Sequence, residues 1–227
     1  CNAVIESLEN NDIPGLDEDL KTRFLAESLF IRAHYFYHLV QQFGDIPMPL
    51  KPTNSVETTA HKTKVDEVWN QIVTDLEFAV ENLPETYQAS EFGHITKYAA
   101  MHHLSRVYLT LKRSDDDLKK ALNYAEQVIN SGKYSLVKSH AELWDINNKN
   151  NSEVLFSVLY TQNAELNGDG NTAHMYFCSA YSEEHPAVKR VIEYGRPWSR
   201  ERSSDFAISL FDKTKDQRWD DCFISRW

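Results

Sequence analysis

The sequence predicts a mainly α-helical protein, with helical hairpins packed against a loop-rich irregular region that has little β-structure. Apolar residues recur with helical spacing through the first part of the chain. Three of these periodic stretches end at Gly44, Pro84 and Gly132, which stop helices. Beyond Lys133 the periodicity is lost. We therefore expect residues 1–135 to form a helical scaffold and residues 136–227 to pack on it within one structural domain.

Composition and charge narrow the class of protein. The chain has 227 residues, 41% hydrophobic and 26% charged, which is typical of a globular protein. Its formal net charge of −10 argues against a nucleic-acid partner, which would need clustered Lys and Arg. No apolar run is long enough to span a membrane. The three cysteines, Cys1, Cys178 and Cys222, have no paired spacing, so we expect free thiols, without zinc or a disulfide framework.

The first long helix is expected over residues 20–43. Asp17 can cap its start, and apolar residues from Phe24 to Leu39 follow at three-and-four spacing. Gly44 can adopt the left-handed conformation that ends a helix, and Pro47 cannot continue one. An extended segment should therefore follow directly.

Three more helices are expected over residues 65–82, 96–111 and 115–131, after a surface loop rich in Pro, Thr and Ser. The four helices form two hairpins. Their second helices align at one fixed offset, which superimposes Ile72, Leu76 and Ala79 on Leu118, Leu122 and Ala125. This self-similarity predicts two stacked units with a shared packing scheme.

The second part of the chain has shorter elements. Residues 141–144 are expected to form one helical turn, and residues 153–160, EVLFSVLY, have the composition of a strand. Residues 161–202 lack a sustained period and are predicted to be mostly irregular, before a last helix over 205–212. Because loops on a rigid scaffold commonly carry recognition, we look for a binding site there.

Polar motifs give no enzyme signature. His34 and His38 have a spacing that can bind one metal ion, but Tyr35 stands where a metalloprotease needs Glu, so no metal site is predicted. Glu27, Arg32 and Arg106 have apolar neighbours and are expected to be partly buried and paired. The sequence has no phosphate-binding loop, no hydrolase elbow and no catalytic Cys–His pair. We therefore predict a protein that is not an enzyme and has no cofactor.

Aromatic side chains are the candidates for sugar binding, since a flat ring can cover the C–H face of a pyranose. Trp69, Trp144 and Trp219 are expected to be packed. Trp198 differs because it lies in the irregular segment between Pro197 and Ser199. The predicted ligand-binding residues all belong to this segment, and they are Trp198, Tyr181, Tyr194, Arg196, Tyr176 and Asn171.

Two resemblances add to these predictions. Leu104, Ser105 and Tyr108, followed by Ala121 and Ala125, resemble a degenerate tetratricopeptide repeat. The run AESLFIRAHYFYHLVQQFGDIPMPL over residues 26–50 resembles the signature of the SusD/RagB family of Bacteroidetes outer-membrane glycan-binding lipoproteins. Similar matches recur in order at DLEFAVENLP, ALNYAEQVINSGKYSL, EVLFSV and GRPWSR.

The SusD/RagB resemblance implies a fold and a function. The expected fold is a set of tetratricopeptide-like helices that cradle a loop-rich remainder. The expected function is to bind an oligosaccharide on the extracellular face of the outer membrane and deliver it to a SusC-like TonB-dependent transporter. Membrane attachment would use only an N-terminal lipid anchor. The alternative is a tetratricopeptide-type module that binds a protein or peptide and no sugar.

The start of the chain allows two interpretations. Cys1 could be the acylated residue of a mature lipoprotein, or it could lie inside a longer chain. The segment CNAVIESLENNDI reads as the tail of a helix and resembles an internal family segment, which favours the second interpretation. On that interpretation the chain is an internal fragment and the lipid anchor is absent from it.

Overall fold

The computed structural model describes residues 1–10, 13–56, 58–145, 147–161, 163, 165, 170, 176 and 200–222. The chain divides into two compact units. Unit 1 comprises Cys1–Ser135 and Val154–Ser157, and unit 2 comprises Leu136–Glu153 and Val158–Trp227. Among the described residues no helix is long and apolar enough to cross a membrane.

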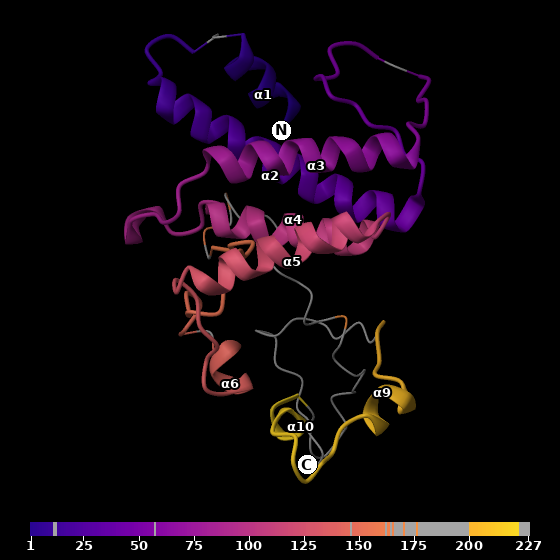
Figure 1. The fold of residues 1–227 in the computed structure, drawn as a ribbon, viewed down its shortest axis with the longest axis vertical. Coiled ribbons are helices and arrows are strands. Elements are labelled where there is room, and N and C mark those ends of the chain that lie inside the picture. The colour runs from indigo at the N-terminus through magenta and orange to yellow at the C-terminus, as the bar shows by residue number, and fades with distance from the viewer. Residues whose placement is uncertain are drawn as a thin grey trace. The chain divides into compact units, whose positions relative to one another are not determined.

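Unit 1 is an array of helices that pair as hairpins, which confirms the mainly α-helical fold (Figure 1). α2 packs on α3, α4 packs on α5, α3 joins the two hairpins by contacting α4, and α1 packs on α2. The elements are α1 (Asn2–Glu9), α2 (Glu18–Phe43), α3 (Val65–Asn82), η1 (Ala89–Glu91), α4 (Lys97–Leu111) and α5 (Asp115–Asn130).

The ends of α2 follow the expected chemistry. The Asp17 carboxylate accepts hydrogen bonds from the backbone N–H of Asp19 at 3.0 Å and of Leu20 at 3.1 Å. At the other end Gly44 has φ 67° and donates its N–H to the Val40 carbonyl at 3.0 Å. That positive φ is accessible to glycine at little cost, so the helix stops there.

The long loop after α2 is closed at its base. Thr63 N–H donates to the Ile46 carbonyl at 2.8 Å in an isolated antiparallel bridge. Beside this bridge the Asp45 carboxylate accepts from the Val65 N–H at 2.9 Å and from Lys64 Nζ at 3.1 Å. The backbone hydrogen bond is the main cause of the lowered pKa of Asp45. The same carboxylate therefore caps the start of α3 and fixes the loop base.

The core of unit 1 is apolar with one charged pair inside it. Phe30, Ile72 and Leu104 are among its fully buried side chains. Arg32 donates from Nε and Nη2 to the two oxygens of Asp75, both at 2.8 Å, and this pair is buried. The prediction that Arg32 is a buried, paired charge is confirmed. A bidentate pair of this kind satisfies both groups in a place that water cannot reach.

The predicted equivalence between α3 and α5 is wrong in one respect. Ile72 and Leu76 are fully buried, but Leu122, which the alignment equates with Leu76, is 59% exposed. α3 lies between α2 and α4, whereas α5 packs mainly on α4. A helix at the edge of the array buries only one narrow face. In α5 this face includes the buried residues Ala121 and Val128.

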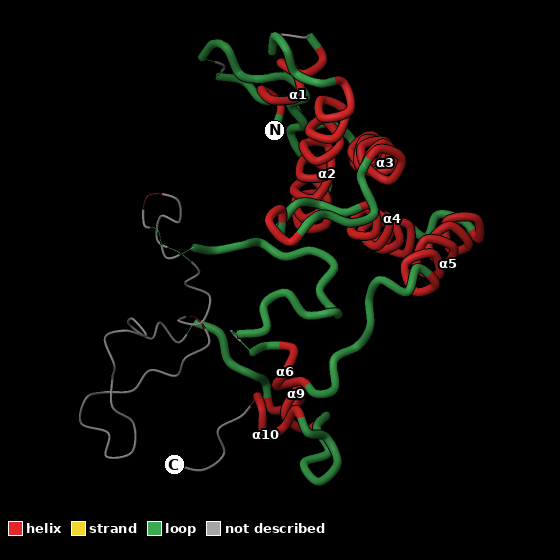
Figure 2. The backbone as a smooth tube through the Cα atoms, turned by 90° about the vertical axis from the view of Figure 1, so that its left-hand side faces the viewer, coloured by secondary structure: helices red, strands yellow, loops and turns green. Residues whose placement is uncertain are grey.

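The strand predicted over residues 153–160 does not form, because a strand needs a partner to complete its backbone hydrogen bonds. Figure 2 shows the described chain as helices and loops without strands. Instead, Phe156 packs edge-on against Phe30, with ring centroids 5.2 Å apart, and Leu155 packs against the same core. The apolar composition of this segment therefore reflects packing against helices.

The described part of unit 2 has three short helices, α6 (His140–Leu143), α9 (Asp205–Ser209) and α10 (Arg218–Cys222), and α10 contacts α6. Its buried residue is Asn151, whose side-chain N–H groups donate to the carbonyls of Leu143 at 3.2 Å and Asn148 at 3.1 Å. None of the buried apolar side chains in the described chain belongs to unit 2. Polar turns and caps therefore organise this part.

Candidate functional site

Five of the predicted ligand-binding residues lie outside the described residues: Trp198, Tyr181, Tyr194, Arg196 and Asn171. Their assignment stays a prediction. Tyr176 is described and is half-buried. Its carbonyl accepts from the N–H groups of Arg200 and Glu201, both at 3.0 Å, and the Arg200 guanidinium lies 5.4 Å from the centre of its ring. The described residues on either side of positions 177–199 therefore meet.

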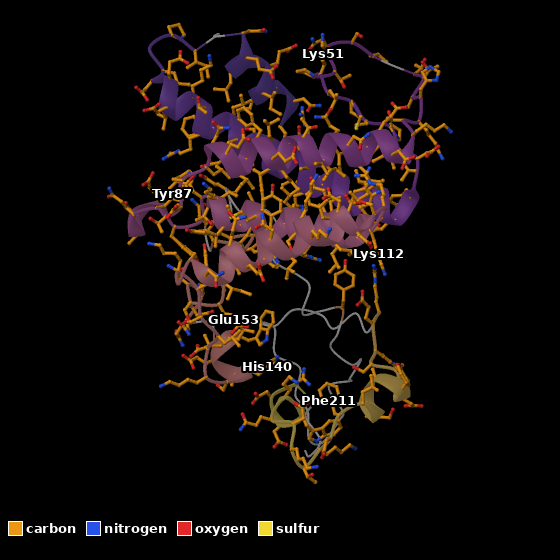
Figure 3. All side chains as sticks on the ribbon, viewed as in Figure 1. Lys51, Tyr87, Lys112, His140, Glu153 and Phe211 are labelled. Atoms are coloured by element: carbon orange, nitrogen blue, oxygen red, sulfur yellow. The ribbon has the colours of Figure 1, made fainter. Side chains whose placement is uncertain are left out.

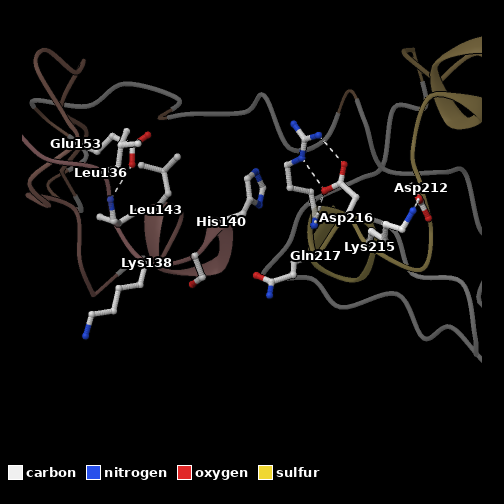
Figure 4. Close-up of a pocket in the computed structure, with 12 residues that line it drawn as sticks. Leu136, Lys138, His140, Leu143, Glu153, Asp212, Lys215, Asp216 and Gln217 are labelled. Carbon is white, nitrogen blue, oxygen red and sulfur yellow. Dashed lines mark hydrogen bonds and ion pairs between the residues drawn. The ribbon is translucent and has the colours of Figure 1, made fainter.

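A pocket of about 700 Å³ lies within unit 2. Figure 4 shows Leu136, Leu143 and Glu153 on one side of His140, and Asp216 and Gln217 on the other. The first group belongs to α6 and its flanking segments, and the second lies around the start of α10. The lining residues are Leu136, Val137, Lys138, Ser139, His140, Leu143, Glu153, Asp212, Lys215, Asp216, Gln217 and Arg218.

The carboxylates of this pocket already have partners. Asp216 accepts from Arg218 Nε at 2.8 Å and Nη2 at 2.6 Å, and this interaction is the largest cause of its lowered pKa. Hydrogen bonds from Thr214, and then from Lys215, lower the pKa of Asp212. Glu153 accepts from the Val137 N–H at 3.0 Å. A general acid or base works best with a pKa near neutral pH. The pKa values of Asp212 and Asp216 are instead lowered, which moves them further from neutral pH.

Trp144 lies next to this pocket, and the prediction that it is packed is wrong. Its side chain is 72% exposed, and its indole N–H donates to His140 Nε2 at 2.9 Å. α6 has only four residues, so its single turn offers no extended apolar face that could bury the ring. Periodicity over so few residues could not have shown this. Trp69 is buried as predicted, and Trp219 is half-buried with its ring 6.1 Å from Phe211.

Unit 1 contains a cluster of imidazoles between α2 and α4. His34 lies 4.6 Å from His38 and 5.3 Å from His103, measured between ring centroids. His103 is 5% exposed, and burial, followed by the charges of His34 and Arg106, lowers its pKa to about 3. No group of His, Cys, Asp or Glu in the described chain is arranged to hold a metal ion. The lowered pKa of His103 keeps its buried ring neutral where it packs.

Glu27 lies in a polar network at the N-terminal half of α2. It is 15% exposed and accepts from the hydroxyl of Tyr87, which Figure 3 labels, at 2.9 Å, and His94 Nδ1 lies 3.0 Å away. Burial is the largest cause of the raised pKa of Tyr87, followed by the charge of Glu27. Glu27 is thus partly buried and paired, as predicted.

Arg106 does not follow the prediction made for it. It is exposed, and its guanidinium lies 5.7 Å from the centre of the Tyr37 ring. An arginine can lay its apolar stem along the surface while its charged end stays in water, so apolar neighbours in the sequence do not imply burial. No ion pair forms at this residue in the described part of the chain.

The fold defines a class: helical hairpins in the first unit and a polar, loop-rich second unit. A family described as "Starch-binding associating with outer membrane", SusD-like, matches residues 1–109. Over these residues the chain belongs to the SusD-like family, and similar proteins match it beyond them. It is 30% identical to SusD-like protein P2 of Formosa agariphila over 86% of this chain, and 27% identical to a SusD-like protein of Bacteroides ovatus over 70%.

Solved structures agree with this family. A laminarin-binding SusD-like protein has 28% identity and a TM-score of 0.63 over 72% of this chain and 35% of its own length. A structure with xylogluco-oligosaccharide has 26% identity and a TM-score of 0.64 over 70% of this chain and 32% of its own. The chain spans only 29–37% of the length of the curated relatives it matches. It therefore corresponds to about a third of such a protein.

Proposed function

We propose that this chain belongs to a protein that binds oligosaccharides at the cell surface without modifying them. The observation that carries the proposal is the similarity to a laminarin-binding protein and to a structure with xylogluco-oligosaccharide, at 28% and 26% identity. Laminarin and xylogluco-oligosaccharide are both neutral glucose-containing glycans. The lowered pKa values of Asp212 and Asp216 fit a binding role rather than acid–base catalysis.

In this proposal the recognition residues are those of the irregular segment. Trp198, Tyr181, Tyr194 and Tyr176 supply aromatic faces for the C–H side of sugar rings. Arg196 and Asn171 supply hydrogen-bond donors and acceptors for the hydroxyl groups. A neutral sugar cannot form an ion pair with the protein. Its affinity should therefore depend on these aromatic faces and on well-placed polar groups.

The protein would act at the extracellular face of the outer membrane, held by an N-terminal lipid and paired with a SusC-like TonB-dependent transporter. The family description, which associates these proteins with the outer membrane, supports this location. The bound oligosaccharide would pass to the transporter beneath. Co-purification of the full-length protein with the transporter from detergent-solubilised outer membranes tests the partnership, and separate elution of the two would contradict it.

Calorimetric titration with laminari- and xylogluco-oligosaccharides tests sugar binding. Replacing Trp198 with Ala should weaken affinity about tenfold through the loss of a stacking face. Phe206→Ala is the matched control, because Phe206 is an exposed aromatic residue of unit 2 outside the proposed site, and it should leave affinity unchanged. Absence of heat across a broad glycan panel would contradict the proposal, and release of reducing ends would indicate an enzyme.

The alternative function, peptide binding on the helical repeats, is disfavoured by one observation. The chain's own residues Val154–Ser157 belong to unit 1, and Phe156 lies against Phe30 and His34 of α2. A face of α2 that an incoming peptide could use is thus occupied by the chain itself. A peptide ligand would first have to displace this segment.

A further inference from the structure

We propose that Trp144, together with the pocket beside His140, forms a second saccharide subsite that uses none of the ligand-binding residues predicted around Trp198. This inference rests on the proposed sugar-binding function and adds a location to it. Its basis is an exposed tryptophan whose ring is held in place next to an open pocket lined largely by charged and polar residues.

Exposure alone does not make an aromatic residue a binding platform, because a freely rotating ring loses entropy when a ligand orders it. Trp144 is held by the hydrogen bond from its indole N–H to His140 Nε2 at 2.9 Å. That bond requires an unprotonated Nε2 on His140. The Asp221 carboxylate lies 3.8 Å from His140 Nδ1, and it favours the tautomer with the proton on Nδ1. Asp221 and His140 together thus orient the ring.

The indole N–H is satisfied by this bond, so the ring can remain exposed without leaving a polar atom unpaired. The His140 ring is tilted by 57° relative to the indole, with centroids 6.1 Å apart, so it does not stack face to face on the ring. With 72% of the side chain exposed, an apolar face is open to a ligand. This is the surface that the C–H side of a pyranose covers.

The pocket next to His140 provides polar groups that are not already used. Its carboxylates are paired or hydrogen-bonded, as described above. In the described chain, the Gln217 side-chain amide and the Lys138 ammonium have no hydrogen-bond or ion-pair partner. An amide can both donate to and accept from a sugar hydroxyl, and an ammonium donates. Both residues line the same pocket as His140, and in Figure 4 the Lys138 side chain extends outward from it.

Charge favours a neutral ligand over an ion. The pocket is lined by three basic residues, Lys138, Lys215 and Arg218, and by three acidic residues, Glu153, Asp212 and Asp216, so their formal charges cancel. A phosphate or carboxylate would lack excess positive charge, and a cation would lack an available carboxylate. A neutral oligosaccharide, which uses a ring face and a few hydroxyl contacts, matches what the site offers.

Tryptophan-to-alanine exchange tests the subsite by calorimetry on the full chain, with laminari- and xylogluco-oligosaccharides as probes. Trp144→Ala should weaken affinity about three- to tenfold, and Trp144→Phe should retain most of it, because a ring face remains. Far-ultraviolet circular dichroism and the melting temperature serve as fold controls, and they should not change for so exposed a side chain.

The outcomes separate this inference from the proposed function. If the unaltered chain binds no glycan, the proposed function fails and the subsite fails with it. If the chain binds, Trp198→Ala weakens binding and Trp144→Ala has no effect, the function stands and the second subsite is refuted. A loss of affinity at Trp144 with an unchanged fold supports it.

His140 is a positioning residue in this proposal, and its test is rescue by a conservative change. His140→Ala removes the acceptor for the indole N–H and should weaken glycan affinity about as much as Trp144→Ala. His140→Gln supplies an amide oxygen that can accept the same hydrogen bond, and it should restore most of the affinity. Equal affinity for all three proteins would show that the ring does not need to be held.

Discussion

The two units of this chain are built by different kinds of interaction. In unit 1 apolar side chains such as Phe30 and Leu76 are fully buried between paired helices, and the Arg32–Asp75 pair lies among them. In the described part of unit 2 no apolar side chain is buried, and caps and Asx turns such as those of Asn151 and Asp212 shape the backbone. Apolar packing is therefore concentrated in unit 1, and the described part of unit 2 depends on polar turns and caps.

The largest expected effect tests the charged pair in unit 1. Asp75→Ala leaves the Arg32 guanidinium buried without its partner, and we expect a loss of about 3–5 kcal/mol in the free energy of unfolding, measured by urea denaturation. The control is Asp116→Ala, which removes an exposed ion pair with Lys120 at 3.5 Å and should cost less than about 1 kcal/mol. Similar losses for both would contradict the difference in burial.

The second prediction compares equal truncations in the two units. Leu76→Ala opens a cavity at a fully buried position and should cost about 2–5 kcal/mol. Leu210→Ala in unit 2 removes the same atoms from an exposed position and should change stability by no more than about 0.5 kcal/mol. Urea denaturation measures both free energies of unfolding. A large loss of stability for Leu210→Ala would mean that unit 2 has a core.

The third prediction concerns pH. The pKa of His103 is lowered from 6.5 to about 3 in the folded chain, chiefly by burial, so the unfolded state binds the proton more readily. Stability from the neutral imidazole is fully present above pH 6.5 and is lost as pH falls toward 3, at about 1.4 kcal/mol per pH unit. His103→Phe should flatten this part of the stability curve, and an unchanged slope would assign it to other groups.

The smallest effect concerns the segment that joins unit 1 from further along the chain. Phe156→Ala removes the edge-on contact with Phe30, and because the ring is partly exposed we expect a cost of about 1–2 kcal/mol. Hydrogen exchange should show faster opening around residues 154–157 while α3 stays protected. Unchanged exchange in this segment would show that Phe156 does not hold it.

Helices with sustained periodicity could be predicted from the sequence to within a few residues. Asp17, Gly44 and Thr96 stand at their boundaries, and local chemistry sets those boundaries. The pairing of Arg32 was also predictable, because a charge among apolar positions on one helix needs a partner. The partner, Asp75, was not, since it comes from another helix.

Burial on outer and short elements could not be predicted. Leu122 has the spacing of a core residue and is exposed, because neighbours in space and not the periodicity of its own helix decide burial. The segment 153–160 has strand composition but meets helices instead of another strand. The exposure of Trp144, beside the candidate site, could not be predicted either. One helical turn has too few residues for the spacing of apolar side chains to distinguish a packed ring from an exposed one.

The closed base of the loop after α2 has a practical consequence. Because Thr63 is bonded to Ile46 and Asp45 holds the start of α3, the residues between them can change in length without moving either helix. Val56, 93% exposed near the far end of this loop, is therefore a suitable place to insert a fluorophore-labelling tag. A protein labelled there would let its location be followed on living cells while the scaffold keeps its structure.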